Sequence, residues 1–224
     1  MIPEALCLAR KDVTLLVGRG SGLAQSFLLG LLLIFIFSLA RGIGEDFSAQ
    51  AASAVFWMAT AFCQVLTFNS LYSLEEDNGQ REALLLLPAP AQHIWLGKAL
   101  AGMFLLLAAQ FLFAPAAMIF LDQSVRGDML LGLALLLLAD LGLAAAGSLT
   151  GALAQGQAAR ESLLSIIIFP LLIPLLFSAI SLGAGVLSGR AEETEGWIGI
   201  LAAFDALFLA AGLALFGFIY GAQE

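Results

Sequence analysis

Residues that could bind a metal or support redox chemistry are scarce in this chain. Its 224 residues include one histidine, His93, and two cysteines, Cys7 and Cys63. One histidine cannot build a bis-histidine haem site or a three-ligand zinc site, and the two cysteines lie too far apart in the sequence to complete one. Cys7 lies near the start and Cys63 in a long apolar run, so we expect no disulfide. The sequence predicts no metal site and no cofactor bound by this chain.

Phosphate-binding and nucleic-acid-binding signals are also absent. Gly97 and Lys98 are followed by Ala99 and lack the earlier glycine of a phosphate-binding loop. If ATP drives this protein, ATP and Mg are therefore bound by another chain. The net charge is −8 and the basic residues form no patch, so no nucleic-acid partner is expected. We interpret His93, which lies near Trp95, as an interfacial or partner-contacting residue.

Two acidic residues, Asp140 and Asp205, fall inside long apolar runs. A charge at the centre of a bilayer costs about 2.5–3.5 kcal/mol on insertion scales, so such an acid is by default a candidate for function. The alternative is a structural acid, held neutral or hydrogen-bonded between helices. The polar residues that could hydrogen-bond to Asp140 in that case are Ser148, Thr150 and Gln110.

A polar stretch at residues 71–98 interrupts the apolar sequence and carries both a start and a stop signal for a helix. Asp77 followed three residues later by Gln80 is a capping box, and Pro88 and Pro90 end the helix because proline lacks the N–H that a continuing helix needs. The pattern predicts a short amphipathic helix between two spans, on which another protein acts. The residues expected at that contact are Glu75, Glu76, Asp77, Gly79, Glu82, Leu86, Pro88 and Pro90.

The elements that must position these residues are membrane helices. The chain is 61% hydrophobic and only 12% charged, whereas soluble domains carry about 25% charged residues. Apolar runs of about 20 residues match the thickness of a bilayer, and runs such as 28–37 show no alternation typical of a transmembrane barrel. We predict an all-α integral membrane protein, one permease domain over residues 1–224, with six spans at about 23–40, 51–71, 99–121, 129–154, 162–186 and 197–219.

A surface helix is expected to precede the spans. Over residues 2–18 the apolar positions are spaced as on one face of a helix, and they are Ile2, Leu6, Ala9, Val13 and Leu16. This pattern suits an elbow helix of a transporter or a plain anchoring helix.

The distribution of basic residues orients the six spans. An even number of spans places both termini on one side. With that side cytoplasmic, six of the nine basic residues are inside, and the three outside are Arg41, Arg126 and Arg190. The positive-inside rule favours this orientation, with both termini cytoplasmic.

Prolines and glycines four residues apart fall on one helix face. Pro170 and Pro174 in the fifth span predict a kink, and they are the hinge candidates of the chain. Two glycine pairs, Gly147 with Gly151 and Gly217 with Gly221, would let another helix approach closely, which internal packing explains.

Two blocks of this sequence, residues 77–90 and 163–176, are similar to those of a known family, and on them the chain resembles the CcmB family, the B subunits of the haem exporter in cytochrome c maturation. Asp77-Asn78-Gly79, Glu82 and the run from Leu84 to Pro90, with Lys98 at the head of the next span, look like the family's cytoplasmic loop. The run from Leu163 to Leu176 is similar to its fifth span. The family usually shows Asp-Gly where this chain has Asn78-Gly79, and the N-terminal half matches by layout rather than by motif.

The resemblance implies a permease subunit of the type-2 ABC exporter class in the bacterial inner membrane. Its implied partners are the ATPase subunit CcmA, the haem-handling subunit CcmC, the small subunit CcmD and, indirectly, the haem chaperone CcmE. The helix at about 78–87 would be the coupling helix seated on the ATPase. We expect two copies of this chain per complex, surrounded by membrane lipid, with haem handled by the complex and not by ligands of this chain.

Three other functions compete with this interpretation. A type-2 permease for lipid or drug would share the coupling loop but lack the fifth-span block. A non-transporting assembly platform would hold haem-handling partners together while nothing crosses it. A secondary transporter is the weakest alternative because it needs an ion site, and no internal repeat is evident.

Overall fold

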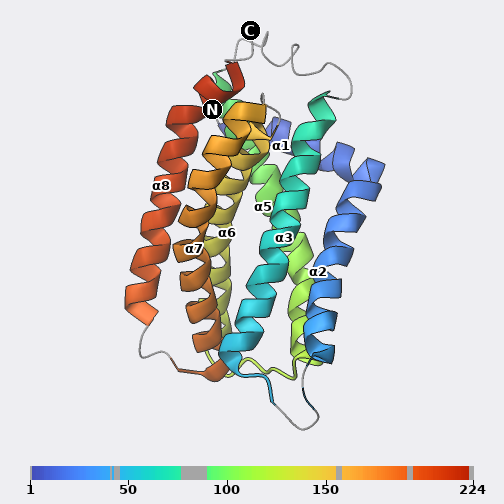
Figure 1. Cartoon of the computed structure of the whole chain (residues 1–224), viewed down its shortest axis with the longest axis vertical. Coiled ribbons are helices and arrows are strands. Elements are labelled where there is room, and N and C mark those ends of the chain that lie inside the picture. Colours follow the sequence, from blue (N-terminus) through green and yellow to red (C-terminus); the bar gives the residue numbers. More distant parts are fainter. Residues whose placement is uncertain are drawn as a thin grey trace.

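The computed structural model describes residues 2–40, 42, 46–76, 90–154, 158–190 and 194–221. Over these residues the chain folds into seven α-helices and no strand (Figure 1). They are α1 (Ile2–Arg19), α2 (Ser21–Leu39), α3 (Ala49–Glu76), α5 (Ala91–Phe120), α6 (Met129–Leu153), α7 (Ala158–Ser188) and α8 (Thr194–Gly221). The all-α prediction is confirmed.

Six of these helices, α2, α3 and α5 to α8, are long and apolar enough to cross a membrane. They stand side by side as a bundle, and α1 lies across the end of the bundle that also holds both termini (Figure 1). The C-terminal ends of α2, α5 and α7 all lie at the opposite end. The six-span prediction is therefore confirmed, with a surface helix in front of it.

The two helices beside the predicted coupling loop are longer than expected. The second predicted span, 51–71, is the helix Ala49–Glu76, and the third, 99–121, is Ala91–Phe120. Polar residues at the end of α3 do not interrupt the helix, since Ser73 donates its hydroxyl to the carbonyl of Ser70 at 3.1 Å. Pro90 caps the start of α5, where its fixed φ suits the entry into a helix. Residues 77–89 are outside the described part of the chain. The coupling helix predicted at about 78–87 lies within that range and stays a prediction.

A glycine separates the surface helix from the first span. Gly20 has φ +67°, in the left-handed region that glycine enters without steric cost. Its N–H donates to the carbonyl of Leu16, and its carbonyl accepts from the N–H of Ala24, both at 3.0 Å. The chain therefore turns sharply at Gly20 while both helices keep their hydrogen bonds.

The buried face of α1 differs from the predicted stripe. Ala5, Ala9, Asp12 and Leu16 are buried, whereas Leu6 is 52% exposed. The reason is close packing against α5: a Cβ added at Gly97 would lie 2.9 Å from Cβ of Leu8 and 3.1 Å from the carbonyl oxygen of Ala5. Because the two helices approach this closely, small side chains face α5.

Helix α6 is the centre of the bundle and packs against α3, α5, α7 and α8. A Cβ at Gly147 would collide with the ring of Phe68, and one at Gly151 with the ring of Tyr72, both on α3. Internal packing thus explains this glycine pair, as expected. It does not explain Gly217, since a Cβ there would meet no described atom within 4 Å.

Helix α7 continues through both of its prolines. Ser178 donates its hydroxyl to the carbonyl of Pro174 at 2.8 Å. This side-chain hydrogen bond links the turn after the second proline to Pro174 itself. The role of Pro170 and Pro174 as a hinge stays a prediction.

Candidate functional site

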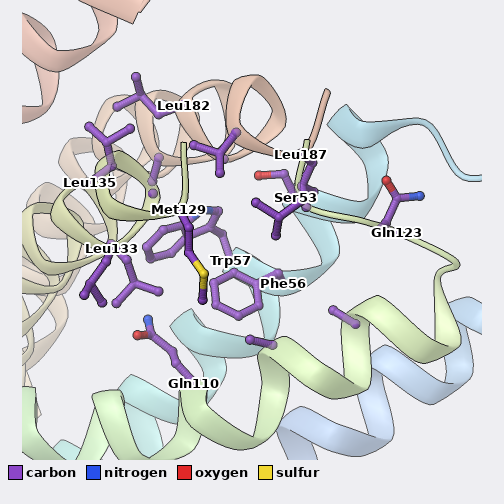
Figure 2. A pocket seen from close by; sticks show the side chains of 18 of the residues that line it. Ser53, Phe56, Trp57, Gln110, Gln123, Met129, Leu133, Leu135, Leu182 and Leu187 are labelled. Atoms are coloured by element: carbon purple, nitrogen blue, oxygen red, sulfur yellow. The ribbon is translucent and has the colours of Figure 1, made fainter. Parts of the chain in front are cut away.

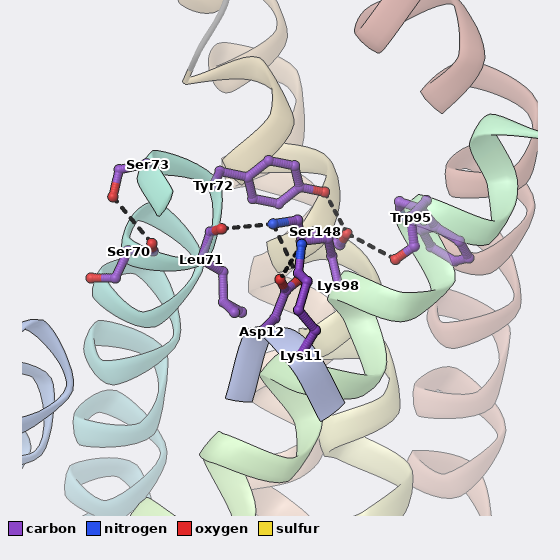
Figure 3. Close-up of polar contacts among 9 residues, drawn as sticks. All are labelled: Lys11, Asp12, Ser70, Leu71, Tyr72, Ser73, Trp95, Lys98 and Ser148. Atoms are coloured by element: carbon purple, nitrogen blue, oxygen red, sulfur yellow. Dashed lines mark hydrogen bonds and ion pairs between the residues drawn. The ribbon is translucent and has the colours of Figure 1, made fainter. Parts of the chain in front are cut away.

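A buried ion cluster lies near the end of α3 and the start of α5. Lys98 of α5 and Asp12 of α1 are each 1% exposed, and Nζ of Lys98 lies 3.2 Å from Oδ2 of Asp12. Lys11 approaches the other carboxylate oxygen of Asp12 at 3.0 Å (Figure 3). Buried charges are tolerated in proteins when they are paired in this way.

The same lysine joins α5 to α3. Its Nζ donates a hydrogen bond to the carbonyl of Leu71 at 2.7 Å and lies 5.0 Å from the centre of the Tyr72 ring (Figure 3). An ammonium over an aromatic face is attracted by the ring quadrupole. Lys98 is thus held by an anion, a carbonyl and a ring from two other helices.

Hydroxyl groups extend the cluster to α6. The hydroxyl of Ser148 donates to the carbonyl of Trp95 at 3.3 Å, and it lies 2.8 Å from the hydroxyl of Tyr72. Because a serine hydroxyl has one hydrogen, Tyr72 is the donor in the second bond. We call Asp12, Lys98, Tyr72 and Ser148 the inner polar cluster. It connects α1, α3, α5 and α6 at one end of the bundle.

The inner polar cluster lies close to the two helix ends that the predicted coupling loop connects. Leu71 and Tyr72 lie shortly before the end of α3 at Glu76, and Lys98 lies two turns after the start of α5 at Ala91. The inner polar cluster therefore fixes the two helix ends between which the loop runs.

His93 also lies within this end of the molecule. Its Nδ1 is 2.6 Å from Oε2 of Glu4 on α1, and the side chain is buried. His93 thus contacts the chain's own surface helix, and its role as an interfacial or partner-contacting residue stays a prediction. Sequence reasoning also missed Asp12. A helical signal for it existed, since Asp12 follows Ala9 by three residues and precedes Leu16 by four.

The predicted coupling residues are only partly within the described structure. Glu75 and Glu76 form the end of α3 rather than part of a separate helix, and Pro90 is exposed directly before α5. The rest lie outside the described residues, namely Asp77, Gly79, Glu82, Leu86 and Pro88. Their role at a partner contact stays a prediction.

The two intramembrane acids are buried on different sides of α6. Asp140 is fully buried, and its Oδ1 accepts a hydrogen bond from Nε2 of Gln110 on α5 at 2.7 Å. Asp205 of α8 lies against α6, where its carboxylate would collide with a Cβ at Gly142. Within the described part of the chain, neither oxygen of Asp205 has a hydrogen-bond partner. The structure does not bring the two acids together.

Of the polar partners considered for Asp140, the structure selects Gln110. Thr150 instead donates to carbonyls of its own helix, those of Ala146 and Gly147. Ser148 belongs to the inner polar cluster. Asp140 is thus hydrogen-bonded between α5 and α6, which is the arrangement expected for a structural acid.

A large apolar cavity occupies the other end of the bundle, and nothing in the sequence predicted it. It has a volume of about 840 Å³ and is bounded by the first turns of α3 and α6 and the last turns of α5 and α7 (Figure 2). Phe56 and Trp57 on α3 face Leu133 and Leu135 on α6 across it. Cavities of this size are typical of small-molecule sites.

Comparison with known proteins gives consistent matches over nearly the whole chain. The family model described as "CcmB protein" matches residues 4–222. The chain is 29% identical over 207 residues to the heme exporter protein B of Pseudomonas aeruginosa, covering 92% of this chain and 90% of that protein. It is 26% identical over 174 residues to the heme exporter protein B of Haemophilus influenzae, covering 78% of each.

Proposed function

The chain belongs to the CcmB family, and from that premise we propose that it is the permease subunit of an ABC-type haem exporter. Its relatives are named heme exporter protein B, and its six apolar helices suit a subunit that spans the membrane. In this proposal a separate ATPase subunit binds ATP and Mg, and this chain converts ATP hydrolysis into haem export or into release of a haem-loaded chaperone.

The proposed assembly has two copies of this chain and two ATPase subunits of the CcmA type. CcmC and CcmD complete the membrane part, and CcmE receives haem on the outer side. The complex lies in the bacterial inner membrane with both termini of this chain cytoplasmic. The coupling residues around Glu82 and Leu86 then face the ATPase, where acidic groups meet basic ones and the leucines supply a buried anchor.

The observation that carries the coupling part of this proposal is the inner polar cluster. A loop can transmit a push only if the helices at its two ends move with it. Lys98 bonds to α3 through the carbonyl of Leu71 and to α1 through Asp12, at 2.7 and 3.2 Å. Separating these helices would leave a buried charge unpaired, which is costly. A push on the loop therefore displaces α1, α3 and α5 together.

The test measures ATP turnover, chaperone release and haem flux on the same purified complex. Wild-type and Glu82→Lys complexes are compared for ATPase activity, for release of the haem-loaded chaperone in detergent, and for haem accumulation inside sealed vesicles. We expect Glu82→Lys to lower turnover and release together, because it reverses a charge at the ATPase contact. Unchanged co-purification with the ATPase and unchanged turnover would refute the coupling assignment.

The same experiment separates the two forms of the mechanism. Release that follows ATP turnover without transmembrane haem flux indicates a mechanical role. Flux that follows turnover indicates an apolar haem path through this subunit, because the only histidine of the chain, His93, pairs with Glu4.

The alternatives are separated by other observations. An assembly platform would bind the ATPase through the coupling helix, yet no haem would cross this subunit. A lipid or drug permease would not share overall similarity with proteins named heme exporter protein B, which this chain does. A secondary transporter would depend on an ionisable group within the spans, for which Asp140 is the candidate.

A further inference from the structure

We propose that the apolar cavity and the polar pocket next to it form one binding site for a zwitterionic phospholipid. An acyl chain fills the cavity between α3, α5, α6 and α7. The phosphate and ammonium groups occupy the polar pocket at the end of the bundle away from the termini. This resident lipid is separate from the cargo and from the coupling to ATP, so the proposal goes beyond the function proposed above.

The lining of the cavity is almost entirely apolar. Its walls are leucines, alanines, phenylalanines, methionines and Trp57, with few polar residues. Ser53 is engaged elsewhere, donating its hydroxyl to the carbonyl of Ile180 at 2.8 Å. Gln110 donates to Asp140, and its Oε1 is fully buried. A charged or strongly polar solute would lose its hydration here without gaining partners, whereas a hydrocarbon chain would not.

The cavity also opens sideways, toward the position of the lipid tails. Three residues of its wall are among the most exposed apolar side chains of the bundle: Phe111 at 81%, Met129 at 77% and Leu130 at 75%. All three lie on candidate membrane spans. An acyl chain can therefore enter from the hydrocarbon layer without crossing water.

A polar pocket of about 1000 Å³ adjoins the cavity. Gln123, Leu182 and Leu187 line both spaces, so the two are adjacent. The polar pocket carries two cations, Arg126 and Arg190, and two anions, which are Asp46 and Asp122. Among the described residues neither arginine has an ion-pair partner.

Main-chain hydrogen bonds hold this pocket in shape. The N–H of Gly127 donates to the carbonyl of Val186 at 2.9 Å, and the N–H of Arg190 donates to that of Gly185 at 3.1 Å. A Cβ at Gly189, which has φ +73°, would lie 3.3 Å from Cβ of Arg126. The α5–α6 connection is thus fastened to the end of α7, and the two arginines come from adjoining backbone segments.

The balance of charges selects the headgroup. Arginine binds phosphate through several parallel N–H donors, and a carboxylate attracts an ammonium group. Two arginines beside two aspartates suit a headgroup with one charge of each sign. A purely anionic amphiphile would meet repulsion from Asp46 and Asp122, and a diacylglycerol would leave the arginines without a phosphate. The positive-inside orientation places this headgroup in the outer leaflet.

The experiment uses the intact complex in detergent and phosphatidylcholine with a brominated acyl chain. Bromine quenches tryptophan fluorescence at short range, and Trp57 is part of the cavity wall. The signal of the site is the quenching seen in the wild-type complex minus that seen with Trp57→Phe. Brominated diacylglycerol and brominated phosphatidylglycerol test the headgroup, and hemin is added as a competitor.

Three variants test the two halves of the site. Arg126→Ala with Arg190→Ala removes the phosphate contacts and should raise the lipid fraction needed for half-quenching by about tenfold or more, because hydrogen bonds to charged groups are among the strong ones. Ala114→Phe fills the cavity and should abolish the Trp57 signal. Ala134→Phe is the matched control, since Ala134 is exposed on α6 and does not line the cavity.

The expected result is quenching by phosphatidylcholine at lower lipid fractions than by the other two lipids. Equal quenching by diacylglycerol would overturn the proposal, because the charged pocket would then contribute nothing. Stoichiometric displacement by hemin would assign the site to a porphyrin instead. Absence of any Trp57-dependent quenching would show that protein, such as a second copy of this chain, covers the cavity.

Discussion

Asp12 illustrates how a single residue on a surface helix can matter to the bundle beneath it. Lys98 is 1% exposed, and its charge is compensated by the Asp12 carboxylate, a carbonyl and a tyrosine ring. An uncompensated ammonium in this position would have to lose most of its hydration. The acid on α1 is therefore required by the lysine on α5.

We predict that Asp12→Ala destabilises the protein by about 3–5 kcal/mol, the usual cost of removing one partner of a buried ion pair. Lys11→Ala is the matched control. The Lys11 side chain is 36% exposed, and pairs of that kind contribute about 0–1 kcal/mol. Thermal unfolding of the purified complex in detergent measures both. Equal effects of the two variants would show that Asp12 and Lys98 do not depend on each other.

Asp140 provides a second test at this scale. In Asp140→Asn the new side-chain carbonyl can still accept the hydrogen bond from Gln110, which is 2.7 Å long in the wild type. We expect complex assembly and ATP-coupled activity to be retained, because the hydrogen bond to Gln110 favours the interpretation of Asp140 as a structural acid. Co-purification and ATPase assays measure this. Loss of activity with assembly intact would instead indicate an acid that works by ionisation, as in a secondary transporter.

At the scale of elements, α6 depends on glycines where it crosses α3. The rings of Phe68 and Tyr72 occupy the space that Cβ atoms at Gly147 and Gly151 would fill. Large aromatic residues on one helix thus pair with missing side chains on the other, and this brings the backbones close together. Helices packed this closely transmit displacement, because a tightly packed core does not deform continuously.

We predict that Gly147→Ala lowers stability by about 1–3 kcal/mol through overpacking against Phe68. Gly217→Ala is the control on a neighbouring helix. No described atom lies within 4 Å of a Cβ at that position, and replacing a helical glycine by alanine usually stabilises by about 0.4–1 kcal/mol. Opposite signs of the two changes in unfolding temperature are expected. A neutral Gly147→Ala would show that α3 and α6 can move apart at no cost.

At the scale of the whole molecule, the two ends of the bundle differ in character. The inner polar cluster and both termini lie at one end, and the apolar cavity with its charged pocket lies at the other (Figure 1). In the proposed orientation the first end meets the ATPase and the second faces the outer side. A displacement of the loop at one end can reach the cavity at the other along α3 and α5, which extend from one to the other.

The orientation itself is testable by cysteine labelling. Ser124 and Ser73 are exposed at opposite ends of the bundle, and Cys63 is buried, so a Cys7→Ser background leaves little native reactivity. We predict that Ser124→Cys reacts with a membrane-impermeant maleimide in intact cells, whereas Ser73→Cys reacts only after permeabilisation. The reverse pattern would place both termini outside.

The sequence alone determined the fold class, the six spans and the family. These depend on local properties: apolar runs long enough to cross a bilayer, and short blocks around Gly79 and Pro170 that resemble one family. Span ends were less predictable. Helix α3 continues to Glu76, and helix α5 already begins at Ala91. In α3 this is because polar residues such as Ser70 and Ser73 can stay helical at the edge of a membrane.

The tertiary structure decided which residues meet. The pairing of Asp12 with Lys98 joins positions 86 residues apart (98 minus 12), and it depends on how α1 crosses α5. The choice of Gln110 as partner of Asp140, the burial of His93, and the cavity between four helix ends depend equally on helix rotation and crossing. Hydropathy carries no information on these, because it reports how much of a helix is apolar and not which neighbour each face contacts.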